Sequence, residues 1–458
     1  MELMVDAAEI FHFWTPLAVL VMLLLAWRHW HDRQAGLLFT YLVSFASIYL
    51  LGPFTRLLPW YDMPGAEDTA VGLQVSVAAL VALAVGAEVM LRWLRSRHVE
   101  MDAVAQKPVA HRLVNIYLIA GTLLFFFVMP IIGRVASLTS LVSTGATLVV
   151  VGFCLKCWNA WVDGEGRRFG LWLLATLLFP ISTILAQGFL GYGLTAAATI
   201  VLFAASFYRP RWKLLVFGML LSYVSLSVYV TYMRDRRDIR ASVWGGESFE
   251  RRLERLKTTA MTPEVFDIGN PAHLERVEDR LNQGALIGLS VSYMSTNHVP
   301  FLHGSTFISA LIAPIPRAVW PDKPVIAGSG DLVSNVTGLI FSESTSVGVG
   351  HVLEAYINFG MAGVVATFFV IGGVLVLVDS VAYRYLHQGN GNSFVLWYLP
   401  GLGLLQIGGS LSEATGFAAA SWAMASMLNI VAGYKRRAKG GTGLSGVRPL
   451  SADREGML

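Results

Sequence analysis

Residues 300–360 read PFLHGSTFISALIAPIPRAVWPDKPVIAGSGDLVSNVTGLIFSESTSVGVGHVLEAYINFG. Hydrophobic stretches flank this segment on both sides, but its own prolines and glycines interrupt it too often for an ordinary membrane-spanning helix. Four prolines lie between Ala313 and Val325, and proline removes a backbone donor and disfavours helix at the residue before it. The sequence therefore predicts an extended, stiff path from 313 to 324 that fixes the positions of Arg317 and Lys323.

The segment has two interpretations. Rigid cations beside a membrane suit an anionic, membrane-borne ligand, because guanidinium and ammonium groups form strong charge-assisted hydrogen bonds with phosphates. Alternatively, the segment is a structured loop that only covers the outer face of a helix bundle. Within it, the hydrophobic residues 301–315 could form a re-entrant or additional span.

The composition indicates a polytopic membrane protein. Hydrophobic residues make up 55% of the 458 residues and charged residues 14%, whereas a soluble protein carries about 25% charged residues. A transmembrane helix needs about 20 mostly apolar residues. We therefore expect an all-α fold with about eleven (11–13) such helices, at residues 8–27, 35–53, 70–93, 114–132, 141–161, 169–187, 194–208, 214–232, 353–378, 394–407 and 414–433.

The distribution of lysine and arginine predicts the orientation. Short cytoplasmic loops carry an excess of these residues. Cations gather in every second loop and in the tail that begins at Lys435, whereas the alternate short loops hold only Arg56 and Arg134. We expect a periplasmic N-terminus, a cytoplasmic C-terminus and a periplasmic loop at 233–352. Arg56 and Arg134 either bind a ligand or reach toward lipid headgroups.

The predicted organisation has four parts. Residues 1–232 form an N-terminal bundle of eight helices, 233–352 a large periplasmic loop that is helical and carries the candidate motifs, 353–435 three further transmembrane helices, and 436–458 a disordered cytoplasmic tail. In the loop, 247–257 is one expected helix. A second begins at Pro271 with Asn270 as N-cap. An apolar stripe continues along it through Leu274, Val277, Leu281 and Ala285.

Several reaction classes lack their motifs. The chain contains no GxxxxGK[ST], no GxGxxG in a βαβ setting, and no metal-ligand spacing outside the apolar spans. Cys154 and Cys157 form a lone CxxC within a hydrophobic stretch, which we interpret as two plain thiols. No basic patch is interleaved with aromatic residues as in a nucleic-acid binder. We expect no cofactor, no metal and no nucleic acid.

The polar residues that remain suit group transfer from a phosphate leaving group, whose negative charge arginine and lysine can stabilise. The candidate cations are Arg317, Lys323, Arg134, Arg280 and the cluster 234–240, which includes Arg237. That cluster could equally be a solvated collar. An acceptor hydroxyl needs a base. The candidates are His298, His303, Glu343, His351 and Glu354, although Glu354 could simply cap a helix.

Two runs resemble a known family. Residues 315–324 (IPRAVWPDKP) and 354–360 (EAYINFG) are similar to motifs of bacterial oligosaccharide repeat-unit polymerases, the Wzy-type O-antigen and exopolysaccharide polymerases. The resemblance implies a GT-C-like, metal-independent glycosyltransferase of the bacterial inner membrane. Such an enzyme moves a growing glycan from undecaprenyl pyrophosphate to a new lipid-linked repeat unit at the periplasmic face. Further partners would be membrane lipids, a chain-length regulator and a flippase.

The resemblance also implies residue roles. Arg317 and Lys323 would bind the pyrophosphate, with Trp320 beside them. Glu354, Tyr356 and Asn358 would bind sugar or place the helix. Our expected catalytic residues are Arg317, Glu354, His298 and His303, and the expected substrate-binding residues are Lys323, Arg134, Arg237, Arg280, Trp320, Glu343, Tyr356 and Asn358.

Three alternatives remain open from the sequence: an O-antigen ligase, a flippase or transporter of lipid-linked oligosaccharides, and a non-catalytic assembly subunit. A flippase should line its interior with charges at mid-membrane depth. Here Glu88 and Asp379 lie toward the cytoplasmic ends of spans, and Glu413 lies toward an outer end. This distribution favours an enzyme that works at the surface.

Overall fold

The structure is a computed structural model. It describes residues 7–30, 34–61, 64–97, 106–128, 136–208, 211–315, 319–320, 322–324, 329–341 and 347–440. Regular structure within these ranges is helical, without strands. The elements are α1 (Ala7–Trp30), α2 (Leu37–Tyr49), α3 (Leu51–Thr55), α4 (Ala66–Ser96), α5 (His111–Leu123), the π-helix η1 (Leu124–Val128), α7 (Ala136–Val162), α8 (Gly166–Ala175), α9 (Leu178–Gln187), α10 (Gly191–Phe207), α11 (Arg211–Trp244), α12 (Phe249–Met261), α13 (Pro271–Leu281), α14 (Gln283–Thr296), α15 (Ser305–Ile312), α16 (Ser329–Thr337), α17 (His351–His387), α18 (Gly391–Gly401), the 3-10 helix η2 (Leu402–Leu405) and α19 (Leu411–Gly440).

The protein is an all-α multi-pass membrane protein. Among the described residues, seven helical stretches are long and apolar enough to cross a membrane: Ala7–His29, Ala66–Ser96, His111–Val128, Thr144–Val162, Gly166–Gln187, His351–His387 and Leu411–Val431. The other four expected spans coincide with α2–α3, α10, α11 and α18–η2, which are not in that set. The total of about eleven therefore stays a prediction.

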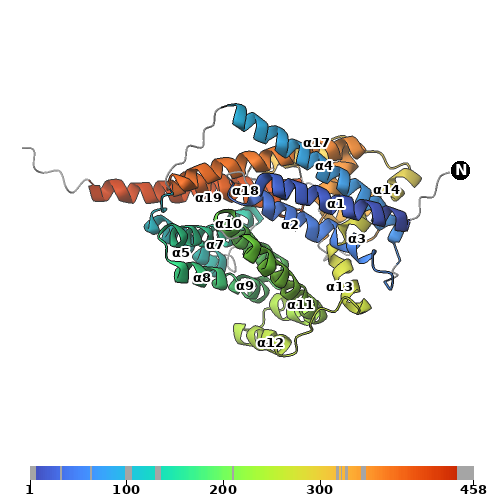
Figure 1. Ribbon diagram of the computed structural model, residues 1–458, viewed down its shortest axis with the longest axis horizontal. Helices are drawn as coiled ribbons and strands as arrows, with labels where there is room; N and C mark the ends of the chain where they lie inside the picture. The colour runs from blue at the N-terminus through green and yellow to red at the C-terminus, as the bar shows by residue number, and fades with distance from the viewer. Residues whose placement is uncertain are drawn as a thin grey trace, which may run out of the picture.

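Helix α4 packs between α17 and α14 (Figure 1). The contacts are backbone against backbone, because glycines lie where the helices cross. A Cβ atom on Gly86 would overlap the carbonyl oxygen of Phe369, and one on Gly372 would overlap that of Leu83. Nearer the start of α4, Gly72 meets Gly284 of α14 in the same way. Small residues of this kind allow membrane helices to approach closely.

Helix α17 is interrupted at Phe359 and Gly360. Gly360 has φ 61° and ψ −147°, a conformation that only glycine adopts readily. Just before the interruption, the carbonyls of Ile357 and Asn358 accept hydrogen bonds from the backbone N–H groups of Leu302 (2.9 Å) and His303 (3.2 Å). The glycine in the EAYINFG run thus allows the loop before α15 to attach to α17.

Two buried carboxylates on α17 hold the first residues of other helices. Asp379 accepts the N–H groups of Ala35 (2.8 Å) and Leu38 (3.1 Å) where α2 begins. Glu354 accepts the N–H group of Leu411 (2.6 Å) where α19 begins. The first N–H groups of a helix have no partner within the helix, and a negative charge there is favourable.

The large loop differs from expectation in its details. Asn270 is the N-cap of α13, as predicted, and its side chain accepts the N–H group of Ala272 at 3.0 Å. The predicted apolar stripe does not form one helix, because α13 ends at Leu281 and α14 begins after Asn282. The expected span at 301–315 contains only the eight residues of α15, about 12 Å long, which is too short to cross a bilayer.

The prediction of an extended path at 313–324 is wrong for the residues of this segment that the structure describes. The Nζ atom of Lys323 donates to the carbonyl oxygens of Ala313 (2.9 Å) and Ile315 (3.1 Å). The backbone N–H of Lys323 also donates to Trp320 O at 3.2 Å. The chain folds back here because the ammonium group supplies donors to carbonyls that follow α15.

We predict that Gly86→Ala destabilises the protein by about 1–3 kcal/mol, because the added methyl group must displace the backbone of α17. The melting temperature of the detergent-solubilised protein, followed by size-exclusion fluorescence, should fall. Gly170→Ala on α8 is the matched control, since nothing lies within 4 Å of a Cβ atom there. Equal melting temperatures for the two variants would contradict the tight contact between α4 and α17.

Candidate functional site

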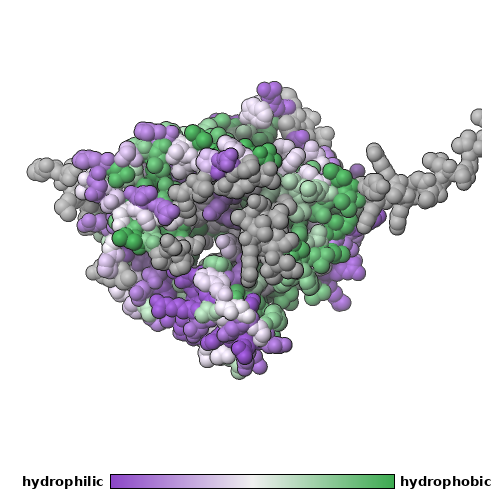
Figure 2. All heavy atoms as spheres, turned by 180° about the vertical axis from the view of Figure 1, so that it is seen from behind, coloured by the Kyte–Doolittle hydropathy of each residue, from purple (hydrophilic) through white to green (hydrophobic). Residues whose placement is uncertain are grey.

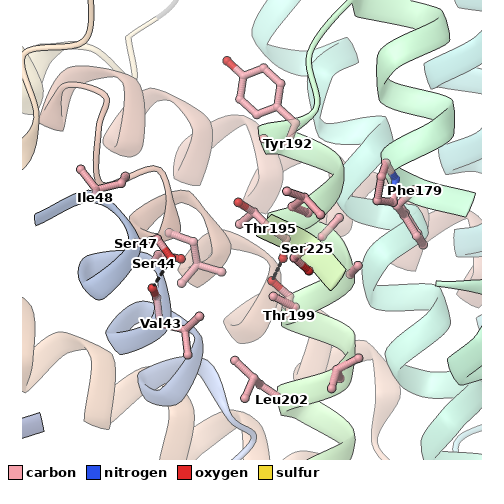
Figure 3. A pocket seen from close by; sticks show the side chains of 18 of the residues that line it. Val43, Ser44, Ser47, Ile48, Phe179, Tyr192, Thr195, Thr199, Leu202 and Ser225 are labelled. Atoms are coloured by element: carbon pink, nitrogen blue, oxygen red, sulfur yellow. Dashed lines mark hydrogen bonds between the residues drawn. The ribbon is translucent and has the colours of Figure 1, made fainter. Parts of the chain in front are cut away.

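A cavity of about 2680 Å³ lies between α1 and α2 on one side and α9, α10 and α11 on the other. Residues of η2 and of the start of α19 also line it. In Figure 3, Ser44 and Ser47 of α2 lie across the cavity from Thr195 and Thr199 of α10. The cavity is thus a gap between two groups of helices.

The cavity walls are apolar in effect, despite these hydroxyl groups. The Ser47 hydroxyl donates to the carbonyl oxygen of Val43 (2.8 Å), and the Thr199 hydroxyl donates to that of Thr195 (2.7 Å), as Figure 3 shows. Serine and threonine often satisfy their donors in this way on the preceding turn. Most other lining side chains are aliphatic or aromatic. Such walls suit a hydrocarbon chain.

The two ends of the cavity differ. At one end the walls meet, because Gly36, with φ 91°, packs against Leu202 so closely that a Cβ atom would lie 2.9 Å from Leu202 O. At the other end the cavity is lined by residues that we call the mouth: Tyr192, Tyr229, Asp267, Leu281 and Glu413. Tyr192, Asp267 and Glu413 are exposed. Figure 2 shows hydrophilic residues gathered around the part formed by the end of α11, α12 and α13.

Three arginines, Arg236, Arg240 and Arg280, lie outside the cavity lining, but their charges act on two tyrosines of the mouth, Tyr229 and Tyr192. Arg236 is half-buried, and burial together with repulsion from Arg280 and Arg240 lowers its pKa. Neither Arg236 nor Arg280 forms an ion pair with any described residue. The charges of both act on Tyr229, which lines the cavity. The negative charge of Asp279 acts on Tyr229 as well, in the opposite sense. Two arginines against one acid leave a net positive charge near this tyrosine, which favours the binding of an anion.

Arg240 is fixed by its neighbours at the same end. Its Nε atom donates to the carbonyl oxygen of Gly188 (3.3 Å), and its guanidinium lies 4.4 Å from the centre of the Phe189 ring. Neither contact involves a carboxylate, and Arg240 forms no ion pair with another described residue. Its charge acts on Tyr192 at the mouth.

Other arginines of the loop are neutralised. Arg234 bonds to Asp235 (2.8 Å) and to Glu264 (3.3 Å), and Glu264 also accepts from Arg276. The bonds to Arg234 lower the pKa of Asp235. Burial alone would raise the pKa of Glu264, but Arg276 and Arg234 outweigh it and lower that pKa. This network joins α11 to the segment before α13. Arg56, one of the two cations in the short loops predicted to be periplasmic, also has a partner within the protein, because its Nε atom lies 2.8 Å from Oε1 of Glu278. This ion pair accounts for Arg56 at that position without a bound ligand.

The matched residues of the EAYINFG run are mostly buried. The Asn358 side chain accepts from the N–H group of Gly304 (3.0 Å) and donates to the Thr306 hydroxyl (2.7 Å). Glu354 is 1% exposed and is not among the residues that line the cavity. Tyr356 is half-buried, with its ring 6.1 Å from that of Phe301. Of the two roles implied by the resemblance, these contacts favour helix placement.

The predicted histidines lie apart from the cavity lining. His298 and His303 are exposed and have positive φ angles of 52° and 46° in the turns before α15. Trp320 is 38% exposed. Arg237 is exposed as well, beside the half-buried Arg236. Among the expected binding residues that the structure describes, only Arg280 acts on a tyrosine of the mouth, and Arg237 is next to Arg236 in the chain.

Part of the predicted site cannot be placed. Arg134, Arg317 and Glu343 lie outside the described residues. Ala313, four positions before Arg317, does line the cavity. Its neighbours in α15 contact α19, where the Thr415 hydroxyl donates to Ala310 O at 2.6 Å. Ala313 is thus a described residue of the cavity wall that also contacts the region of α19.

Sequence reasoning did not single out three residues at or near the mouth: Arg236, Arg240 and Glu413. Arg236 and Arg240 belong to the candidate cluster 234–240, but their positions in the sequence could not show that they lack an ion-pair partner whereas Arg234 has one. Glu413 follows a Ser-x-x-Glu pattern, the signal of a capping box, that could have located it at a helix start. No group of three His, Cys, Asp or Glu side chains in the described ranges could hold a metal.

Comparison with known proteins does not identify a family for this chain. No protein-family model, no curated protein and no solved structure matches the chain. The helices define the class of protein, a multi-pass α-helical membrane protein, and the geometry described above is the basis for any functional assignment.

We predict that Glu354→Ala destabilises the protein by about 2 kcal/mol, because the buried N–H group of Leu411 loses a charged acceptor. Glu354→Gln should cost less, since an amide oxygen can still accept this bond. Thermal unfolding of both variants checks the order. An alanine variant as stable as the wild type would show that Glu354 does not hold α19.

Proposed function

We propose that this protein is an oligosaccharide repeat-unit polymerase of the bacterial inner membrane. It transfers a growing glycan from undecaprenyl pyrophosphate to a lipid-linked repeat unit at the periplasmic face, with a GT-C-like fold and without metal or nucleotide. One observation carries the proposal: an apolar cavity between membrane helices ends at tyrosines on which three arginines act, and these arginines have no counter-ion among the described residues.

A lipid diphosphate has two parts that suit this arrangement: its hydrocarbon chain suits the apolar cavity, and its anionic diphosphate suits the arginines. The cavity borders α1 and α11, whose Leu23 and Met219 line it and are 62% and 76% exposed. A polyprenyl chain can therefore pass from the bilayer between these helices and remain in apolar surroundings. Its diphosphate would then reach the mouth, where Arg236 and Arg280 supply charge-assisted hydrogen bonds.

The same arginines suit the chemistry of glycan transfer. Departure of the lipid diphosphate leaves negative charge on its oxygens, and preorganised cations in a partly desolvated site lower the energy of that charge. The half-buried guanidinium of Arg236 is in such a place. Arg317, which follows the cavity-lining Ala313 by four residues, is the second cation that we assign to this diphosphate.

The orientation is part of the proposal. The positive-inside distribution places the mouth and the loop 233–352 in the periplasm and the C-terminus in the cytoplasm. The start of α1 and the end of α19 lie at opposite ends of the longest axis, which supports termini on opposite sides of the membrane (Figure 1).

A lipid-linked oligosaccharide flippase is the second candidate. The length of the cavity favours it, since the lining runs from Gln34, before α2, to Glu413 at the mouth. The charges favour the polymerase. Asp267 and Glu413 are the charged residues among the described lining, and both lie at the mouth rather than at mid-depth. An O-antigen ligase would use the same donor and differ in its acceptor.

Purified protein in liposomes with lipid-linked repeat units should produce a ladder of longer lipid-linked glycans. We predict that Arg236→Gln combined with Arg280→Gln slows this reaction about 10- to 100-fold, the loss of about 1.5–3 kcal/mol from hydrogen bonds to a charged group. Arg251→Gln combined with Lys257→Gln, at two exposed positions of α12, is the charge-matched control.

The outcomes of this assay separate the candidates. Ladders at the wild-type rate from the double variant would remove these arginines from the site. Transfer of the lipid across the bilayer by the wild type, without longer products, would identify a flippase instead.

We also predict that Arg317→Ala abolishes long-chain polymer in cells while the level of the protein is unchanged, because the leaving diphosphate loses a cation. Gel analysis of surface polysaccharide, with immunoblots of the membrane fraction, measures both. Normal chain lengths in this variant would exclude a role for Arg317.

A further inference from the structure

The start of α19 carries a carboxylate that faces the cavity. The backbone N–H of Ser410 donates to Oε2 of Glu413 (3.3 Å), and the backbone N–H of Glu413 donates to the Ser410 hydroxyl (3.1 Å). These reciprocal bonds form a capping box, which fixes the first turn of the helix. They occupy Oε2 and leave Oε1 without a partner in the described part of the chain.

Glu413 is well placed relative to the arginines. Its side chain is exposed and lines the mouth. Its charge and that of Arg240 both act on Tyr192, so acid and cation border the same part of the mouth. The other lining carboxylate, Asp267, uses Oδ1 to accept the N–H group of Gly269 at 2.8 Å within its own loop.

We propose that Glu413 is the general base of the transfer reaction, an inference that rests on the proposed polymerase function. Oε1 of Glu413 accepts the proton of the acceptor sugar hydroxyl. The hydroxyl oxygen forms a bond to the anomeric carbon of the donor glycan as the bond from that carbon to the diphosphate oxygen breaks. The electron pair leaves with the lipid diphosphate beside Arg236 and Arg280, and the exposed Glu413 later releases the proton to water.

The structure also explains why Glu354 is not this base. Glu354 is 1% exposed, and its Oε2 accepts the N–H group of Leu411, two residues before Glu413. A sugar hydroxyl in the cavity cannot reach a carboxylate behind the wall. Glu354 is instead a positioning residue, because it holds the turn from which Glu413 projects.

Glu413→Gln tests the assignment without removing the cap, since glutamine serves equally in a capping box. In the liposome assay, kcat should fall about 100-fold or more, the usual contribution of a general base, while KM and the melting temperature stay near wild type. Glu254→Gln on α12, an exposed carboxylate that does not line the cavity, should change kcat less than threefold.

Azide provides a second readout, because it attacks a glycosyl donor without giving up a proton. Glu413→Gln should therefore release glycosyl azide from the lipid-linked donor at the wild-type rate. Wild-type ladder formation by Glu413→Gln would overturn the assignment, and so would a failure of azide to restore turnover. If the wild-type protein itself forms no ladder, the polymerase proposal fails rather than the choice of base.

Discussion

Two buried carboxylates on one helix determine how this bundle is assembled. Asp379 and Glu354 of α17 each accept backbone N–H groups at the start of another helix, α2 in one case and α19 in the other. A buried carboxylate without donors is costly, and so are helix-start N–H groups without acceptors. Each bond satisfies both needs. Because α2 forms one wall of the cavity and α19 contributes to its mouth, α17 sets the position of both.

This arrangement separates a close-packed part of the bundle from an open one. Glycine contacts hold α4 directly against α17 and α14. By contrast, α2 and α10 touch near Gly36 and enclose a large cavity beyond that point. The cavity has apolar walls, and three arginines behind its lining act on the tyrosines of the mouth. We propose that an amphiphile with a long hydrocarbon chain and an anionic head is complementary to that combination.

The sequence predicts helix positions well, and tertiary partners poorly. In its described residues, each expected span falls on one helix or on two consecutive ones, and Asn270 caps α13 as its local pattern indicates. A local sequence pattern predicts which face of a helix is apolar, but it does not predict which distant residue a polar side chain will bond to. Glu354 bonds to a residue 57 positions away, and the pairing of Arg234 depends on Glu264, 30 positions away. For the same reason the run 234–240 could not show that Arg236 stays unpaired.

The most direct test is a cryo-electron microscopy structure of the protein in nanodiscs with a lipid-linked oligosaccharide bound. We expect density for the lipid chain between α2 and α10, with the diphosphate within hydrogen-bond distance of Arg236 or Arg280. A diphosphate at the opposite end, near Gln34, or on a surface remote from the cavity would contradict the central claim.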